Sequence, residues 1–304
     1  MFCGIGGFHQ AANGLGMRCV FACDIDDEAR RAYHHNYGIL PKGDISKLTP
    51  RQIPDHDIFF AGFPCQPFSI IGDRKGFADI RGTLFFEIVR ILKSKKPRAV
   101  LLENVKQLTT HNKGHTMRRI IGALEELGYC VDWKVLNALD FGLPQKRERV
   151  LIAATVDRFD AFPWPEPRTP MKPLSEILEE KPDSRYLVSD RIKKRRQSAH
   201  KSEHNPGIWH ENKAGNISSH PFSCALRAGA SHNYLLVDGK RRLTSREMLR
   251  LQGFPDSFEI ICNDSQTRKQ AGNAVPVPLA EAGIEGILNA IEASQVARKR
   301  KSAP

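Results

Sequence analysis

The stretch AVLLE at residues 99–103 is a short apolar run that ends in an acidic residue, and similar runs recur through the first half of the chain. They predict strands at residues 19–23, 57–61, 131–136 and 150–154, and the amphipathic stretches between them predict helices at residues 27–36, 83–93 and 115–127. Nearly continuous apolar strands separated by helices indicate a mostly parallel sheet that helices cover on both faces. We therefore predict an α/β fold.

The second half of the chain differs in composition. The stretch FPWPEP at residues 162–167 has too many prolines to continue a helix or an inner strand. From there to about residue 240 the chain is polar, basic and rich in His, Ser and Asn, and residues 277–290 return to helical spacing. We expect one domain made of residues 1–164 and 268–304, with a smaller domain at residues 165–267.

Composition limits the classes of protein to which the chain can belong. It carries 46 Lys and Arg against 34 Asp and Glu, a net charge of +12, which favours contact with a polyanion such as nucleic acid. The seven cysteines show no CxxC spacing, so we expect neither disulfides nor a metal site. The absence of a run of 18 apolar residues and of a secretory signal leads us to expect a cytoplasmic protein that does not contact a membrane.

A glycine-rich loop, GIGG at residues 4–7, precedes an amphipathic stretch. Gly4, Gly6 and Gly7 would let the backbone turn tightly and approach a ligand at a helix N-terminus. Asp24 follows at the end of the next predicted strand, where an acid can bind ribose hydroxyls. Taken alone, the pattern fits a tight turn equally well. Asp44 could reach an adenine amino group, although a turn residue is the simpler interpretation.

A cysteine lies in a stiff loop, AGFPCQPFS at residues 61–69, directly after a predicted strand. Ligands bind at the carboxyl ends of strands in open α/β sheets, so we expect this loop at a binding site. Two prolines beside Cys65 present its thiol rigidly, which a structural cysteine does not require. The alternative is a cysteine packed in a rigid loop.

Residues 63–66, Phe-Pro-Cys-Gln, resemble the catalytic motif of the cytosine-5 DNA methyltransferases, above all those of bacterial restriction-modification systems. Five further blocks resemble the family's other motifs, in order: the glycine loop, Glu-Asn-Val at 103–105, Gln-Lys-Arg-Glu-Arg at 145–149, residues 242–255, and Gln-Ala-Gly-Asn-Ala-Val at 270–275. They extend over nearly the whole chain, which makes a chance match implausible.

The resemblance implies a Rossmann-like methyltransferase domain that binds S-adenosyl-L-methionine and a smaller target-recognition domain. The implied cofactor-binding residues are Phe2, Gly4, Gly6, Gly7, Asp24, Ile25, Asp44, Ile45, Pro64, Leu84, Asn273, Ala274 and Val275. The implied catalytic residues are Cys65, Glu103, Arg147 and Arg149. The implied substrate-binding residues are Gln66, Ser69, Asn104, Gln145 and Arg227.

The chemistry explains why such residues are needed. A thiolate from Cys65 that adds to carbon 6 of cytosine turns carbon 5 into a nucleophile, and an acid, Glu103, must then protonate N3. Arg147 and Arg149 alternate in a segment entering a strand, so both point the same way and could reach the base or hold the cysteine loop. A stacked base is inaccessible, so the cytosine must be flipped out, and the basic domain at about 165–241 would offset that cost.

Two departures from the family pattern are visible. The family usually has a strand ahead of the glycine loop, in the middle of the sheet, whereas only Met1 precedes Phe2 here. Its absence would expose core and misplace the cofactor loop, so we expect either a true start that lies upstream or a destabilised or inactive version. Comparing cofactor binding with a chain extended by about ten residues tests this. The family's Thr-Leu near the end of the recognition region is Ala225-Leu226 here.

Several alternatives remain at this point. A tRNA methyltransferase of the same family would share most motifs, and an inactive N-terminally truncated DNA-binding homologue would share the fold. A dehydrogenase would explain the glycine loop and Asp24, but not the Pro-Cys-Gln loop. We expect double-stranded DNA as partner, a separate restriction endonuclease, and a monomer. The recognised DNA sequence has no readable code.

Overall fold

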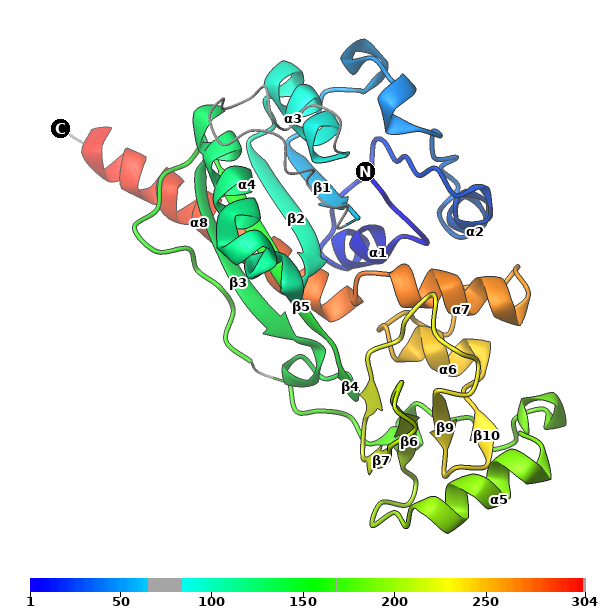
Figure 1. Cartoon of the computed structure of the whole chain (residues 1–304). Coiled ribbons are helices and arrows are strands. Elements are labelled where there is room, and N and C mark those ends of the chain that lie inside the picture. Colours follow the sequence, from blue (N-terminus) through cyan, green and yellow to red (C-terminus); the bar gives the residue numbers. More distant parts are fainter. Residues whose placement is uncertain (65–83, 168, 303–304) are drawn as a thin grey trace.

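A four-stranded sheet forms the centre of the first lobe in the computed structural model, which describes residues 1–64, 84–167 and 169–302 (Figure 1). Its strands, in spatial order, are β1 (Ile58–Gly62), β2 (Ala99–Val105), β5 (Glu148–Thr155) and β3 (Cys130–Asn137). β1 pairs with β2 in parallel, and β5 pairs antiparallel with both β2 and β3, so β1, β2 and β3 share one direction. The predicted α/β class is confirmed, with β5 as the reversed strand.

Helices cover both faces of this sheet. One face carries α3 (Leu84–Lys95) and α4 (His115–Glu126), and the other carries α1 (Gly7–Gly14) and α8 (Val277–Ser302). Successive residues of a strand point to opposite faces, so Val100 and Leu102 pack with α3 and α4 whereas Leu101 packs with α8. Each buried leucine or valine contributes about 1.5–3 kcal/mol to folding. This two-sided burial explains why the runs show no polar alternation.

The helices between the strands begin and end close to the predicted bounds. α2 (Asp27–Tyr37) begins after Asp26, whose carboxylate accepts hydrogen bonds from the backbone N–H groups of Glu28 and Ala29. It ends at Gly38, which has a φ of 70°. An acidic cap before the first turn of a helix and a left-handed glycine after its last turn are local signals that can be read from the sequence.

The prediction of a strand at residues 19–23 is wrong. Within the described chain, Cys23 makes a single isolated bridge with Lys42, and no named strand includes these residues. A cavity of about 470 Å³ is lined by residues 18–22 and by residues of β1, and within the described chain no strand fills this space to pair with residues 19–23. The N-terminal ammonium of Met1 donates to the carbonyl of Phe60 at 2.7 Å, on the same open edge of β1. Despite this gap the glycine loop remains attached to Asp24, through Gly4 N at 2.7 Å.

A second lobe follows the proline-rich stretch (Figure 1). Its antiparallel sheet has the order β10 (Arg241–Arg242), β9 (Leu235–Val237), β6 (Ile208–Glu211) and β7 (Ile217–His220). Its helices are α5 (Asp190–Ala199) and α6 (Ser245–Arg250), followed by α7 (Asp264–Asn273) at the border of the two lobes. A short parallel pair, β4 (Gln145–Lys146) with β8 (Ser223–Cys224), joins the lobes. The predicted division into residues 1–164 with 268–304 and residues 165–267 stays a prediction.

Short 3-10 turns complete the described chain. They are η1 (Ile45–Lys47), η2 (Pro50–Gln52), η4 (Lys106–Thr109), η5 (His111–Gly114), η6 (Ala138–Asp140), η7 (Leu174–Glu176) and η8 (Ser184–Tyr186).

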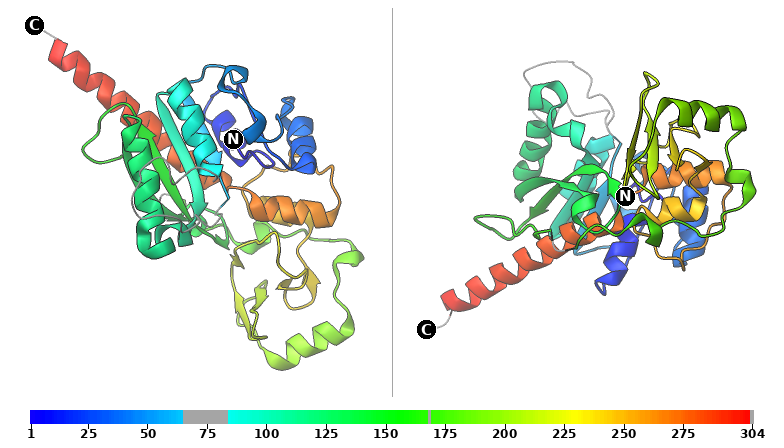
Figure 2. Two further views of the ribbon diagram at one scale, coloured as in Figure 1. Left: turned by 45° about the horizontal axis from the view of Figure 1, so that its top comes forward. Right: turned by 90° about the horizontal axis from the view of Figure 1, so that it is seen from below.

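α8 is a long helix whose C-terminal end projects away from the sheet (Figure 2). The segment Asp264–Ala297, which includes most of α8, is long and apolar enough by composition to cross a membrane, but 67% of its most apolar window is buried inside the protein. α8 packs against α1, β5 and β2. Its apolar character therefore reflects its position in the core of the first lobe.

Candidate active site

A pocket of about 430 Å³ opens at the carboxyl ends of β1 and β2. The residues expected to bind cofactor that line it are Phe2, Gly4, Asp24, Ile25, Asp44, Ile45, Pro64, Leu84 and Asn273. The same pocket is lined by Glu103, Asn104, Arg147 and Arg149. The predicted cofactor-binding residues and the predicted catalytic residues thus line one continuous space. Some members of the two groups, such as Glu103 and Asn273, are more than 150 positions apart in the sequence.

The glycine loop and Asp24 form one wall of this pocket. Gly4 has a φ of 52°, which favours glycine, and its N–H donates to Oδ2 of Asp24 at 2.7 Å. Oδ1 of Asp24 accepts from the N–H of Asp26 at 2.9 Å. Each carboxylate oxygen retains a second lone pair for a ligand hydroxyl. Ile25, 74% exposed, leaves an apolar side chain open to the pocket.

Asp44 lies on the adjoining wall as the cap of η1. Its Oδ1 accepts hydrogen bonds from the Oγ of Ser46 at 2.8 Å and from the Ser46 N–H at 2.9 Å. These hydrogen bonds lower the pKa of Asp44, which keeps its carboxylate charged. The turn interpretation of Asp44 is therefore correct locally, and the turn itself lines the pocket.

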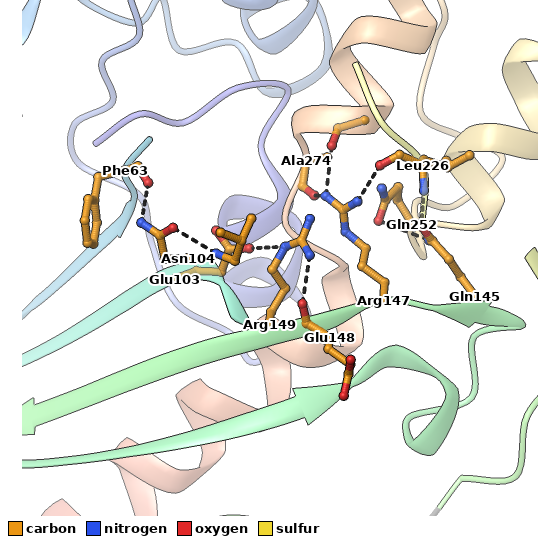
Figure 3. A network of polar contacts seen from close by, with 12 residues as sticks. Phe63, Glu103, Asn104, Gln145, Arg147, Glu148, Arg149, Leu226, Gln252 and Ala274 are labelled. Carbon is orange, nitrogen blue, oxygen red and sulfur yellow. Dashed lines mark hydrogen bonds and ion pairs between the residues drawn. The ribbon is translucent and has the colours of Figure 1, made fainter. Parts of the chain in front are cut away.

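Glu103 and Arg149 form a buried ion pair on the opposite wall (Figure 3). Nε of Arg149 lies 2.8 Å from Oε1 of Glu103, and their side chains are only 13% and 11% exposed. Glu103 pairs in register with Gly62 of β1, and a Cβ at Gly62 would lie 3.3 Å from Oε2. Burial raises the pKa of Glu103, while the charges of Arg149 and Arg147 oppose that rise. A carboxyl with a raised pKa at a pocket wall is suited to proton transfer.

Asn104 holds the chain that leads to the cysteine loop. Its Nδ2 donates to the carbonyl of Phe63 at 2.7 Å, and its Oδ1 accepts from the N–H of Val105 at 2.8 Å (Figure 3). The amide of Asn104 is therefore turned toward the backbone, and its predicted contact with substrate stays a prediction. Pro64, which follows Phe63, lines the pocket and is exposed. Cys65, Gln66 and Ser69 lie outside the described residues.

Arg147 is fully buried and holds three backbone segments together (Figure 3). Nη1 donates to the carbonyl of Leu226 at 2.8 Å, and Nη2 donates to those of Gly272 at 2.9 Å and Ala274 at 2.8 Å. In this structure its terminal nitrogens are occupied by carbonyls, and the prediction that Arg147 reaches the base or holds the cysteine loop stays a prediction. Arg149 points the same way, as predicted, and is the arginine that meets Glu103.

We expect an Arg147→Met substitution to destabilise the protein by about 2–4 kcal/mol, because three buried carbonyls would lose charged donors while the apolar stem is retained. Urea unfolding measures the change. Lys146→Met is the matched control, since Lys146 is exposed and next to Arg147. Equal stability of the two variants would contradict the bridging role of Arg147.

Gln145 belongs to the same junction. It is completely buried; its Nε2 donates to the carbonyl of Leu251 at 2.7 Å and its Oε1 accepts from the N–H of Leu226 at 2.9 Å. Gln145 thus links the two lobes in this structure, and its contact with substrate stays a prediction. Gln252, which sequence reasoning did not single out, donates to the carbonyl of Ala271 at 2.5 Å. Both glutamines lie in motif blocks, but only the fold shows that they face one another.

Besides Gln145, five of the predicted residues that the structure describes do not line the pocket. Gly6 packs against Tyr37 and Gly7 against the carbonyl of Val275, where a Cβ would lie 2.4 Å from that oxygen. Ala274 contributes its carbonyl to Arg147, and Val275 is buried beside Gly7 and Gly62. Arg227 stacks on Tyr234 at 4.8 Å and lines a separate small cavity of about 50 Å³ in the second lobe. Gly6, Gly7 and Val275 thus pack behind the residues that line the pocket. Contact of Arg227 with DNA stays a prediction.

Two residues that the sequence did not indicate also line the pocket. Asp26 and Lys269 form an ion pair with Nζ 2.5 Å from Oδ2, although 243 residues separate them. The sequence around Asp26 shows the signal of a helix cap, but no local pattern in it shows that Lys269 is the partner of Asp26.

Comparison with known proteins gives consistent results. A sequence model of the C-5 cytosine-specific DNA methylases matches residues 1–289. The chain is 55% identical to the Type II methyltransferase M.NgoBI of Neisseria gonorrhoeae over 93% of its own length and 90% of that protein. It is 52% identical to M.HaeII of Haemophilus aegyptius over 96% of its length and 92% of that protein. A putative DNA modification methyltransferase from an Escherichia coli prophage shares the fold, with a TM-score of 0.74, 20% identity and coverage of 96% and 98% of the two chains.

Proposed function

Because the chain belongs to the family of C-5 cytosine-specific DNA methylases, we propose that its pocket holds S-adenosyl-L-methionine next to a flipped cytosine, with Cys65 and Glu103 performing the covalent chemistry. The chain is a DNA (cytosine-5-)-methyltransferase, and the relatives to which it is similar are Type II methyltransferases. The observation that carries the proposed arrangement is the single pocket that unites Asp24 and the glycine loop with the Glu103–Arg149 pair.

The pocket fits the cofactor in size and chemistry. Its volume of about 430 Å³ lies in the range that small ligands occupy. Asp24 would bind the ribose hydroxyls, Ile25 and Ile45 would contact the adenine, and Asn273 would contact the amino-acid end. Three carboxylates, Asp24, Asp26 and Asp44, favour a ligand that carries positive charge. When bound, S-adenosyl-L-methionine supplies an electrophilic methyl group.

Glu103 moves the proton at N3 of the base. Its Oε1 is held by Arg149, and the absence of a side chain at Gly62 leaves space beside Oε2. Burial raises the pKa of Glu103 above that of a free glutamate, which favours the protonated form that can donate. Arg149 then stabilises the carboxylate that proton donation leaves behind. Arg149 therefore orients the acid and offsets its charge within the pocket.

Cys65 supplies the electron pair. Its thiolate forms a bond to carbon 6 as Glu103 protonates N3, and carbon 5 becomes the nucleophilic end of an enamine. After carbon 5 is methylated, its proton passes to a base or to water, the bond between sulfur and carbon 6 breaks, and N3 returns its proton to Glu103. The thiolate and the acid are regenerated. Asn104 positions this loop by holding Phe63 two residues before Cys65.

Double-stranded DNA is the substrate we assign to the second lobe. The net charge of +12 favours binding to the negatively charged DNA backbone. The free energy of these phosphate contacts offsets the few kcal/mol that base flipping costs. Residues 165–267 form the proposed recognition domain. We further propose that the enzyme is a cytoplasmic monomer that associates with DNA, and that it belongs to a restriction-modification system with a separate endonuclease, as the Type II names of its relatives suggest.

Incubation with S-adenosyl-L-methionine labelled in its methyl group tests this assignment. We expect label in duplex DNA and none in tRNA, and bisulfite sequencing of DNA from cells expressing the gene should reveal 5-methylcytosine within one short sequence. Label in tRNA alone would overturn the choice of substrate.

A further inference from the structure

Helix α7 lies at the border of the two lobes, between α2 and α6 (Figure 1). Lys269, Gln270, Gly272 and Asn273, all from its C-terminal half, line the pocket. Nζ of Lys269 lies 2.5 Å from Oδ2 of Asp26, and the two side chains are 46% and 25% exposed. The helix that carries Asn273 is thus tied to the opposite wall of the pocket by one ion pair.

Asp26 connects this ion pair to the glycine loop. Its Oδ1 caps α2 by accepting from the N–H groups of Glu28 and Ala29, both at 3.1 Å, and its own N–H donates to Asp24 at 2.9 Å. Asp24 in turn accepts from Gly4 at 2.7 Å. A continuous chain of hydrogen bonds therefore runs from Gly4 through both aspartates to α7, along the part of the pocket proposed to hold the cofactor.

The positive charges of the pocket have different partners. Arg147 is occupied by three backbone carbonyls and Arg149 by Glu103. Among the described residues that line the pocket, Lys269 is the cation that pairs with an aspartate of the wall formed by Asp24 and Asp26. Burial acts to raise the pKa of Asp26, but the hydrogen bonds from Lys269 and the backbone outweigh it and the pKa is lowered, so the pair is charged at neutral pH.

Arg268, the neighbouring residue, faces the other way. Its guanidinium donates to the carbonyl of Ala230 and lies 3.2 Å from Nε2 of His232, both in the second lobe. Two adjacent cations on one helix thus serve different lobes, which provides a natural control.

We propose that Lys269 is a positioning residue for the cofactor, which holds α7 and Asn273 against the Asp24–Asp26 wall through its ion pair with Asp26. This inference rests on the proposed binding of S-adenosyl-L-methionine in the pocket. A purely electrostatic role would act in the opposite direction, because removing a positive charge from the wall favours a cationic ligand. The sign of the effect therefore separates positioning from charge balance.

Calorimetric titration of the full chain with S-adenosylmethionine and with S-adenosylhomocysteine, which lacks the charged sulfonium, tests the proposal. We expect Lys269→Met to raise the Kd of both ligands by about three- to fivefold, the effect of losing a partly exposed ion pair. Lys269→Arg should restore the affinity. Arg268→Met removes the same charge from the next residue and should leave both Kd values unchanged.

A double-mutant cycle identifies the partner. Asp26→Asn keeps a capping side chain at α2, so we expect it to weaken binding as Lys269→Met does and the double variant to be no weaker than either. If the losses of affinity in the two single variants added up in the double variant, Asp26 would not be the partner through which Lys269 acts. An unchanged or lower Kd in Lys269→Met would overturn the positioning role. Absence of binding by the wild-type chain would instead contradict the proposed cofactor site itself.

Discussion

Replacing Cys65 with alanine is expected to lower methyl transfer to DNA by at least about four orders of magnitude, because loss of a catalytic nucleophile costs up to about 10⁶ in kcat. Without the thiolate no bond forms at carbon 6 of cytosine, and carbon 5 remains too weak a nucleophile to accept a methyl group. Single-turnover transfer of labelled methyl groups to duplex DNA measures the loss. DNA binding should persist, since the change removes only a thiol.

Cys130→Ala is the matched control for this substitution. Cys130 begins β3, the strand at the other edge of the sheet from β1, and does not line the pocket. We expect its variant to keep wild-type activity. Retention of even a hundredth of the wild-type rate in Cys65→Ala would contradict a mechanism that depends on this thiol.

Substitution Glu103→Gln should reduce the single-turnover rate by about 10²–10⁴-fold, the contribution of a positioned general acid. Glutamine keeps the shape and a hydrogen-bond acceptor for Arg149 but cannot deliver a proton to N3. Glu148→Gln is the control, because Glu148 pairs with Lys106 at 2.7 Å on the surface and does not line the pocket.

The same pair of variants gives a pH test. Because burial raises the pKa of Glu103, its acid form persists to higher pH than that of a free glutamate, and the rate should fall as pH rises through that raised pKa. This decline should be absent in Glu103→Gln and present in Glu148→Gln. A decline of the same size in all three proteins would assign it to another group.

The sequence predicted those parts of the fold that depend on local patterns. The apolar run at residues 99–103 became β2, and the acid at its end reached the pocket because strand ends meet at one edge of a sheet. The spacing of Arg147 and Arg149 predicted that they point the same way. The prediction of a strand at residues 19–23 failed because an apolar pattern cannot show whether a neighbouring strand is there to pair with it.

Contacts between distant segments account for what could not be predicted. Arg147 is bound to carbonyls that lie 79, 125 and 127 residues away, and these contacts decide that it joins lobes while Arg149 serves the acid. The partner of Lys269 is 243 residues distant. Motif matching placed Gln145 and Asn104 at the site, but only the hydrogen bonds distinguish residues that hold the backbone from residues free to meet a base.

The central claim is that Cys65 forms a covalent bond to the target cytosine, and DNA carrying 5-fluorocytosine at the methylated position tests it most directly. Fluorine at carbon 5 cannot leave as the proton does, so the bond between sulfur and carbon 6 should persist. In the presence of S-adenosylmethionine, we expect wild-type protein to migrate with the DNA on a denaturing gel and the Cys65→Ala variant to run free. A denaturant-resistant complex with Cys65→Ala would contradict the claim.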